Sequence, residues 1–403
     1  MKAGMENAVV RSFSAGLSQK GVRNHNERLL LSLLQRNGHM PGSDLAKLSG
    51  LSPPTVSAIL RGLESDGLLA RGDPVRGKVG KPSVPMMLSP NGVLSFGLKI
   101  GRRSADLLLM DFTGAVRQQM QFNYAYPVPE DVFAFLAECI AQISADLTAD
   151  QANRICGIGV AAPFEMLNRH GATGRKVDGF LSWKDVNIPL EVAKFSTLPV
   201  SVVNDATAAC QAEHVFGRGK EFRDYAYFFV GAFIGGGIVL NHSVFEGRQG
   251  NAGALGSLRS VSPLGESMQL VDMASIYLLE KRLAEVDLDP AILWQQPQDW
   301  SSIARYVDPW LGQTAQELAK ASLSTCSVID FEAILIDGAF PDEIRSELVE
   351  RVRRYIANQD TRGLLPPQIE TGMVGGNARA IGAACGPIFS RFMLNTNAGL
   401  AVA

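Results

Sequence analysis

The stretch SVVNDATAAC, residues 201–210, places an amide and a carboxylate side chain directly after an apolar run. A strand that ends here would carry Asn204 and Asp205 to the edge of a sheet and into a cleft. Asp205 could then act as a general base or accept hydrogen bonds from ligand hydroxyl groups, and Asn204 offers both a donor and an acceptor. The alternative is structural, because Asp205 could instead cap a helix that starts at Ala206.

A second set of candidate contacts lies in the basic N-terminal part of the chain. Residues 1–90 hold 12 Lys and Arg against 6 Asp and Glu, whereas the remainder holds 26 against 34. A basic segment attached to an acidic body suggests a polyanionic partner. A solvated basic surface with no partner would produce the same balance, so charge by itself leaves both interpretations open.

Three short helices are predicted in this basic segment. Residues 26–38 have apolar side chains at helical spacing and end on a glycine. A second helix opens with Ser43 as its N-cap, and a third opens with Ser52 as N-cap and Pro53 in the first helical position. The pattern is that of a small helical domain.

The residues around the second turn predict a helix-turn-helix. Ala46 is small where two helices would cross, Gly50 suits a tight turn, and Val56 would lock the third helix onto the second. The outer face of the third helix then presents short side chains and one cation, which suits the major groove of DNA. The predicted base-contacting residues are Thr55, Ser57 and Arg61.

Two short strands over 68–71 and 84–88 follow, so the predicted domain is a winged helix. The loop between them is rich in Gly, Pro and cations. Such a loop could lie along a narrow groove and neutralise phosphates, and the alternative is a flexible, solvated turn. The predicted phosphate-contacting residues are Arg76, Lys78 and Lys81.

The body of the chain alternates β-hairpins with helices, and this arrangement occurs twice. The pattern predicts two α/β lobes with a cleft between them. The predicted domains are a flexible tail (1–20), a winged helix-turn-helix domain (21–90) and a body (95–403) whose lobes cover about 95–202 plus the C-terminal helix 376–393, and about 203–375.

Composition excludes several classes of protein. Hydrophobic residues make up 46% of the chain and charged residues 19%, and no apolar run reaches the ~18–20 residues that a membrane span needs. The N-terminus lacks the apolar core of a signal peptide, so we expect a cytoplasmic protein with no membrane partner. The five cysteines stand singly, without metal-ligand spacing, and are expected to be reduced, buried thiols: Cys139, Cys156, Cys210, Cys326 and Cys385.

Several motifs in order along almost the whole chain resemble the ROK family of repressors, open reading frames and sugar kinases. The winged-helix part resembles that of ROK regulators, and the body carries GIGVAAP, Trp183, VVNDATAACQAEHVFG, GGGIVLN, GRQGNAGALGS and IGAA. The resemblance implies an actin-like or hexokinase-like fold of two RNase H-like lobes. In kinase members of the family, the cleft between the lobes binds a sugar and ATP, and the position of Asp205 holds the base that deprotonates the sugar hydroxyl.

The phosphate-binding loops depart from the pattern of family kinases. Where those kinases have D-x-G-G-T, this chain has Lys99-Ile100-Gly101-Arg102-Arg103, so a cation replaces the carboxylate on the metal side. In the second loop, Phe233 stands where phosphate would approach. These changes predict no catalytic residues and no nucleotide cofactor.

The sugar and zinc motifs of the family are also altered. Ala254-Leu255-Gly256-Ser257 replaces E-x-G-H, which removes both functional side chains. The zinc motif aligns with Ser262, Leu264, Gly265, Met268, Gln269 and Val271, which include no thiolate or imidazole ligand. We therefore expect no metal and no cofactor, with Asn204 and Asp205 left as ligand-binding residues.

The sequence thus predicts a transcriptional regulator of ROK type, a repressor of carbohydrate uptake or catabolism genes. Its expected partners are a double-stranded DNA operator, a sugar or sugar derivative as effector, and further copies of itself in a homodimer or homotetramer. Two rivals remain open. One is a sugar kinase with a DNA-binding head, and the other is a regulator with an empty cleft that a protein partner controls.

Overall fold

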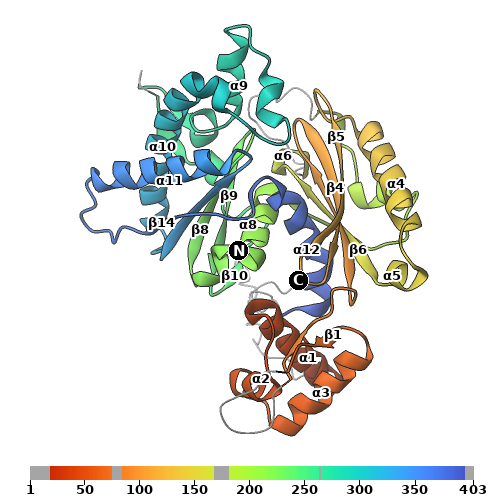
Figure 1. Cartoon of the computed structure of the whole chain (residues 1–403). Helices are drawn as coiled ribbons and strands as arrows, with labels where there is room; N and C mark the ends of the chain where they lie inside the picture. Colours follow the sequence, from red (N-terminus) through yellow and green to blue (C-terminus); the bar gives the residue numbers. More distant parts are fainter. Residues whose placement is uncertain (1–18, 75–83, 168–180, 263–264, 395–403) are drawn as a thin grey trace, which may run out of the picture.

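The computed structural model describes residues 19–74, 84–167, 181–262 and 265–394. Figure 1 shows a small helical head below two larger lobes, each built on a sheet, with helices α8 and α12 between the two sheets. The head, the two sheets and this helix pair together position every candidate site.

The head consists of α1 (Gln19–Asn37), α2 (Gly42–Ser49), α3 (Pro53–Ser65) and the antiparallel strands β1 (Leu69–Arg71) and β2 (Met86–Leu88). Helix α1 begins inside the predicted tail. The prediction of Ser43 as an N-cap was wrong, because α2 begins at Gly42 and the extended residue Pro41 precedes it. The N-cap at Ser52 is confirmed, since its hydroxyl accepts a hydrogen bond from the backbone N–H of Thr55.

The first lobe contains a five-stranded sheet in the order β5-β4-β3-β6-β7. Strands β3 (Leu94–Ile100), β4 (Ser104–Asp111) and β5 (Val116–Asn123) are antiparallel, whereas β6 (Ile155–Ala162) and β7 (Val200–Asn204) run parallel to β3. Strand β7 therefore extends past the predicted lobe boundary at 203. The helices of this lobe are α4 (Pro129–Ala145), α5 (Ala149–Asn153), α6 (Phe164–Leu167) and α7 (Ile188–Val192).

The second lobe repeats this design with a sheet in the order β10-β9-β8-β13-β14. Its strands are β8 (Tyr225–Val230), β9 (Ile234–Leu240), β10 (Ser243–Val244), β13 (Ala333–Gly338) and β14 (Gln368–Thr371). A small separate hairpin pairs β11 (Arg259–Val261) with β12 (Ser267–Gln269). The helices are α9 (Tyr277–Ala284), α10 (Ala304–Cys326) and α11 (Asp342–Ala357).

Helices α8 (Asp205–Phe216) and α12 (Ala378–Phe392) pack against each other between the two sheets. Glycines bring backbones into direct contact here. A Cβ on Gly159 of β6 would lie 1.7 Å from the Ala383 carbonyl oxygen, and a Cβ on Gly382 would lie 1.7 Å from the Ala208 carbonyl oxygen. Such close packing leaves no space for the helices to shift independently of the sheet.

The five cysteines are free and buried, as predicted. Burial raises the pKa of the Cys156 thiol to about 11, so this thiol is poorly reactive near neutral pH. None of the helices in the described ranges is long and apolar enough to cross a membrane.

Candidate functional site

Helix α3 presents its predicted DNA-contacting residues to solvent. Thr55, Ser57 and Arg61 are exposed, while one apolar face of the helix is buried in the head: Val56, Ile59, Leu60 and Leu63. Arg61 Nε donates only to the Ser57 carbonyl oxygen at 3.3 Å, so the guanidinium has most of its donors available. The exposed strip is therefore polar, carries one cation, and belongs to a rigid helix.

The predicted wing follows the third helix, between β1 and β2. Arg76, Lys78 and Lys81 lie outside the described residues. The flanking strands β1 and β2 pair in register, with Leu69 opposite Leu88 and Arg71 opposite Met86. Their pairing provides the base of a wing at the predicted place.

The head is joined to the body through a continuous apolar cluster. This cluster includes residues of α1, of the first sheet and of α12: Leu30, Leu31, Leu34, Leu108, Met110, Ala384, Cys385 and Ile388. Polar contacts add to it. Gln35 Nε2 donates to the Val215 carbonyl oxygen at 3.1 Å, and the Leu394 backbone N–H donates to Ser32 Oγ at 2.9 Å. The head therefore contacts the C-terminal ends of both α8 and α12.

Asn204 and Asp205 lie where β7 passes into α8. The structure shows that Asn204, and not Asp205, is the N-cap: its Oδ1 accepts from the backbone N–H groups of Ala206 at 3.0 Å and Thr207 at 3.2 Å. Asp205 is the first residue of the helix. The alternative in which Asp205 caps the helix is therefore wrong, because the side chain one position earlier already satisfies the free N–H groups.

Asp205 is paired with a residue that sequence reasoning did not select. Arg379, in the first turn of α12, reaches Asp205 Oδ2 with its Nη1 at 3.4 Å. Its guanidinium carbon also lies 5.0 Å from the centroid of the Phe229 ring, at the end of β8. The available signal was a cation in the otherwise small and apolar stretch ARAIGAA.

Lys99 is buried near this pair, at the end of β3. Its ammonium group donates to Asp106 and, at 2.7 Å, to Ser104 Oγ. Burial lowers the pKa of Lys99 to about 8, although the neighbouring Asp106 carboxylate opposes this shift. Lys99 is thus held by its own strand pair.

The two loops that align with kinase phosphate loops contact each other across the lobes. Arg102 lies over the Phe233 ring, 4.9 Å from its centroid. Arg103 Nη2 reaches Glu280 Oε2 at 3.3 Å, and Trp294 Nε1 donates to Glu280 Oε1 at 2.7 Å. Arg102 and Arg103 of the first lobe therefore both contact side chains of the second lobe.

The segment aligned with the family's zinc motif forms a plain hairpin. Ser262 and Glu266 are hydrogen-bonded at the turn between β11 and β12, and Leu264 lies outside the described residues. Across the described part of the chain, no group of three or more His, Cys, Asp or Glu side chains could hold a metal ion.

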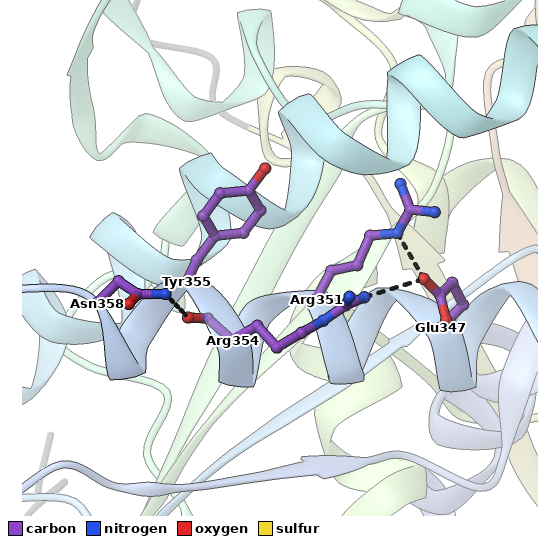
Figure 2. Close-up of a pocket in the computed structure, with 5 residues that line it drawn as sticks. All are labelled: Glu347, Arg351, Arg354, Tyr355 and Asn358. Carbon is purple, nitrogen blue, oxygen red and sulfur yellow. Dashed lines mark hydrogen bonds and ion pairs between the residues drawn. The ribbon is translucent and has the colours of Figure 1, made fainter.

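A shallow groove on α11 lies in the second lobe, apart from the Asp205 region (Figures 1 and 2). Figure 2 shows Arg351 and Arg354 reaching the Glu347 carboxylate, at 2.7 and 3.2 Å. Arg351 also pairs with Asp308 of α10 at 2.6 Å. The charges of this groove are matched internally, so we assign it no ligand.

Comparison with family models matches residues 95–266 to the ROK family and residues 23–70 to a winged helix-turn-helix DNA-binding domain. Among curated relatives, the uncharacterized protein y4fQ of Sinorhizobium fredii is 24% identical over 91% of this chain and 91% of its own length. The xylose repressor of Bacillus subtilis is 22% identical over 60% of this chain and 62% of its own length. The transcriptional dual regulator NagC of Escherichia coli is 25% identical over 61% of this chain and 59% of its own length. The chain thus spans about three fifths of these two named regulators.

Solved structures show the same fold. A ROK family transcriptional regulator described as a homolog of the E. coli MLC protein has a TM-score of 0.65 and 22% identity, covering 92% of this chain and 96% of its own. A ROK family glucokinase from Streptomyces griseus has a TM-score of 0.56 and 21% identity, covering 72% of this chain and 98% of its own. The predicted two-lobed α/β body with an N-terminal winged helix is confirmed.

Proposed function

The chain contains a ROK family domain behind a winged helix-turn-helix DNA-binding domain, and from this premise we propose that it is a transcriptional repressor of carbohydrate uptake or catabolism genes. The observation that carries the proposal is the exposed polar face of α3 on a head that shares its core with the body. The xylose repressor and NagC among its relatives support the same class of function.

The proposed DNA interface has two parts. Thr55, Ser57 and Arg61 contact base edges in the major groove, because α3 exposes them while burying its opposite face. The wing cations contact phosphates, and replacing Lys78 and Lys81 by Ala should weaken binding to all sequences and reduce its salt dependence. Equal salt dependence in the wild type and this variant would contradict the wing contact.

We propose that the effector is a sugar or sugar derivative that binds through Asp205. The carboxylate lies near the seam between the lobes and is a hydrogen-bond acceptor for hydroxyl groups. Asn204 is proposed as a second ligand contact. Its Oδ1 atom caps α8, so it would contact the ligand through the Nδ2 amide group, which donates.

The proposal includes no kinase activity. Phosphoryl transfer needs a metal held by carboxylates and glycine loops whose backbone approaches the phosphates. Here Lys99 is paired with Asp106 where the metal ligand would be, and Arg102 and Phe233 contact each other across the phosphate loops. A coupled ATPase assay with a panel of sugars tests this, and measurable phosphorylation would contradict it.

One observation favours the second candidate, a regulator without a sugar ligand that a protein partner controls. Asp205 already has a partner in Arg379, and the Asn204 side-chain oxygen already has two. Thermal-shift measurements with sugars, sugar phosphates and polyols separate the two candidates, because a bound ligand stabilises the fold by mass action.

We further propose that the protein works as a homodimer or homotetramer in the cytoplasm, together with its operator. A single winged helix offers few base contacts, and two-fold symmetric regulators gain specificity by binding two half-sites. Sedimentation of the whole protein at micromolar concentration tests this, and a monomer that still binds one half-site would contradict it.

The central test is selection of duplexes from a random DNA library with the full-length protein. We expect an enriched sequence with two related half-sites, and we expect Arg61→Ala to lose preference at one base pair in each. Failure to enrich any sequence at moderate salt would refute the proposed function.

A further inference from the structure

The Asp205 carboxylate is held by a loose internal partner. Arg379 Nη1 donates to its Oδ2 atom at 3.4 Å, and the two side chains are 12% and 20% exposed, respectively. Charge-assisted N–H···O bonds usually measure about 2.7–2.9 Å, so this contact is long. Among the described residues no other group donates to this carboxylate, although a carboxylate offers about four acceptor positions. Asp205 therefore has acceptor capacity that the fold does not use.

Arg379 has a second anchor that does not depend on Asp205. Its guanidinium lies over the Phe229 ring, with 5.0 Å between the guanidinium carbon and the ring centroid. Cations are attracted to the face of an aromatic ring, most strongly where water is excluded. The Nε atom is buried and has no acceptor among the described residues, which is unfavourable in the present arrangement. Arg379 can thus stay over Phe229 when Asp205 takes another donor.

The cations of the neighbouring hairpin that the structure describes all have other partners. The Lys99 ammonium is buried and bonded to Asp106 and Ser104 within its own hairpin. Arg102 is engaged with Phe233, and Arg103 with Glu280. Competition for the carboxylate therefore rests on Arg379.

Both partners begin helices that end at the head. Asp205 is the first residue of α8, whose Val215 carbonyl accepts from Gln35 of α1. Arg379 is in the first turn of α12, which is followed by the Leu394 N–H that donates to Ser32 of α1. The two helices touch backbone to backbone at Gly382 and Ala208. The Asp205–Arg379 pair therefore lies at the start of the two helices whose C-terminal ends contact the head (Figure 1).

We propose that Arg379 is an internal competitor for the effector: it occupies Asp205 in the ligand-free protein, and a hydroxyl-bearing ligand binds by displacing it. This inference rests on the proposed function, because it assigns the regulation of the same site. Arg379 lowers the affinity for the effector, and its guanidinium remains over Phe229 when the ligand is bound. It tunes affinity and is not a contact that the ligand requires.

The test measures sugar affinity in four full-length proteins: wild type, Arg379→Gln, Asp205→Asn and Arg351→Gln. The last is the matched control, because Arg351 is also a partly buried, ion-paired arginine but lies on α11 (Figure 2). The probes are D-xylose, D-glucose and N-acetyl-D-glucosamine, each added alone at increasing concentration. The readout is the thermal unfolding midpoint, which rises with ligand concentration according to the dissociation constant.

We expect Arg379→Gln to bind at least one probe about two- to threefold more tightly than wild type, because the long, partly exposed ion pair that it removes contributes little free energy to the ligand-free state. Arg351→Gln should match wild type, and Asp205→Asn should bind more weakly than wild type. Arg379→Lys keeps the charge without the planar stacking group and should shift affinity in the same direction but less. It replaces the Gln variant if that protein does not fold.

Equal or weaker affinity of Arg379→Gln would overturn the inference, since it would make Arg379 a neutral bystander or a direct ligand contact. So would the absence of stabilisation of every protein by every probe, because removing a competitor should uncover the site. Operator selection by the wild type separates this inference from the proposed function. If the wild type selects no DNA but the Arg379→Gln variant binds sugar more tightly, the proposed repressor function is refuted and the competitor role of Arg379 is supported.

Discussion

The exposed face of α3 and the region around Asp205 differ in what their polar side chains contact. On α3, Thr55, Ser57 and Arg61 face solvent, and their fold-internal contacts stay within the helix and its cap. Around Asp205, the charged groups that the structure describes are paired inside the protein: Lys99 with Asp106 of its own hairpin, and Asp205 with Arg379 of α12. The first surface can bind a partner without rearrangement, whereas the second must exchange an internal contact for an external one.

The two sites also differ in how the surrounding structure holds them. Helix α3 is stabilised by local packing inside the head. The Asp205 region instead joins the two lobes, and the helices that start there run to the head. The proposed exchange of partners at Asp205 therefore lies at the start of the two helices that contact the head, whereas the packing that positions α3 lies inside the head.

The largest expected effect tests the close contact between α8 and α12. Gly382→Ala places a Cβ 1.7 Å from the Ala208 carbonyl oxygen, and we expect it to lower the free energy of unfolding by about 3 kcal/mol or more, because backbone has to move. Chemical denaturation measures this loss. Gly312→Ala in α10 is the control, since its Cβ would meet only the end of the Arg351 side chain at 3.9 Å. Equal stability of the two variants would show that the helix pair is not closely packed.

The next effect tests whether the α3 face is open to DNA. Arg61→Ala should weaken binding to the selected operator by about 1–3 kcal/mol and relax preference at one base pair, because one bidentate base contact is lost. Fluorescence anisotropy with specific and random duplexes measures both. The unfolding midpoint should stay unchanged, since Arg61 is exposed. A uniform loss across all sequences would instead make Arg61 a phosphate contact.

A third effect concerns pH, at the place where α8 meets the head. Burial lowers the pKa of His214 to about 4, and its ring contacts the His242 carbonyl oxygen at 2.9 Å and the Tyr225 hydroxyl at 3.3 Å. Because the unfolded chain binds the proton first, this residue's contribution to stability is complete above about pH 6.5 and is lost as pH falls towards 4. His214→Gln should recover roughly 2 kcal/mol of the stability lost over that interval, measured by urea unfolding. An unchanged pH slope would show that His214 titrates normally.

The smallest effect separates the two residues of the opening pair. Asn204→Ala should lower the free energy of unfolding by about 1 kcal/mol, because α8 loses its N-cap. Asp205→Asn should change it by less than about 0.5 kcal/mol, since the Arg379 contact is long and partly exposed. Thermal unfolding of both variants measures the difference. A larger loss of unfolding free energy in Asp205→Asn than in Asn204→Ala would show that Asp205 has the structural role.

Much of the head could be predicted because its signals are local. Ser52 caps α3 as expected, and Gly50 adopts the left-handed conformation with φ 69° that a helix end favours. The error at Ser43 was also local, because Pro41 takes the N-cap position and the helix starts two residues earlier, at Gly42. Local signals also could not choose the N-cap of α8. Asn and Asp are comparable N-caps, so only the three-dimensional geometry distinguishes Asn204 from Asp205.

The sequence by itself determined the winged helix and the strand that delivers Asn204 and Asp205, and it marked Lys99, Arg102 and Phe233 as unusual residues for the loops in which they stand. Only the tertiary structure decided what those side chains contact. Asp205 and Arg379 are 174 residues apart in the chain, and they meet because glycines let α8, α12 and the first sheet approach backbone to backbone. Periodicity and capping act over a few residues, whereas partner choice in a lobe interface depends on how distant surfaces pack.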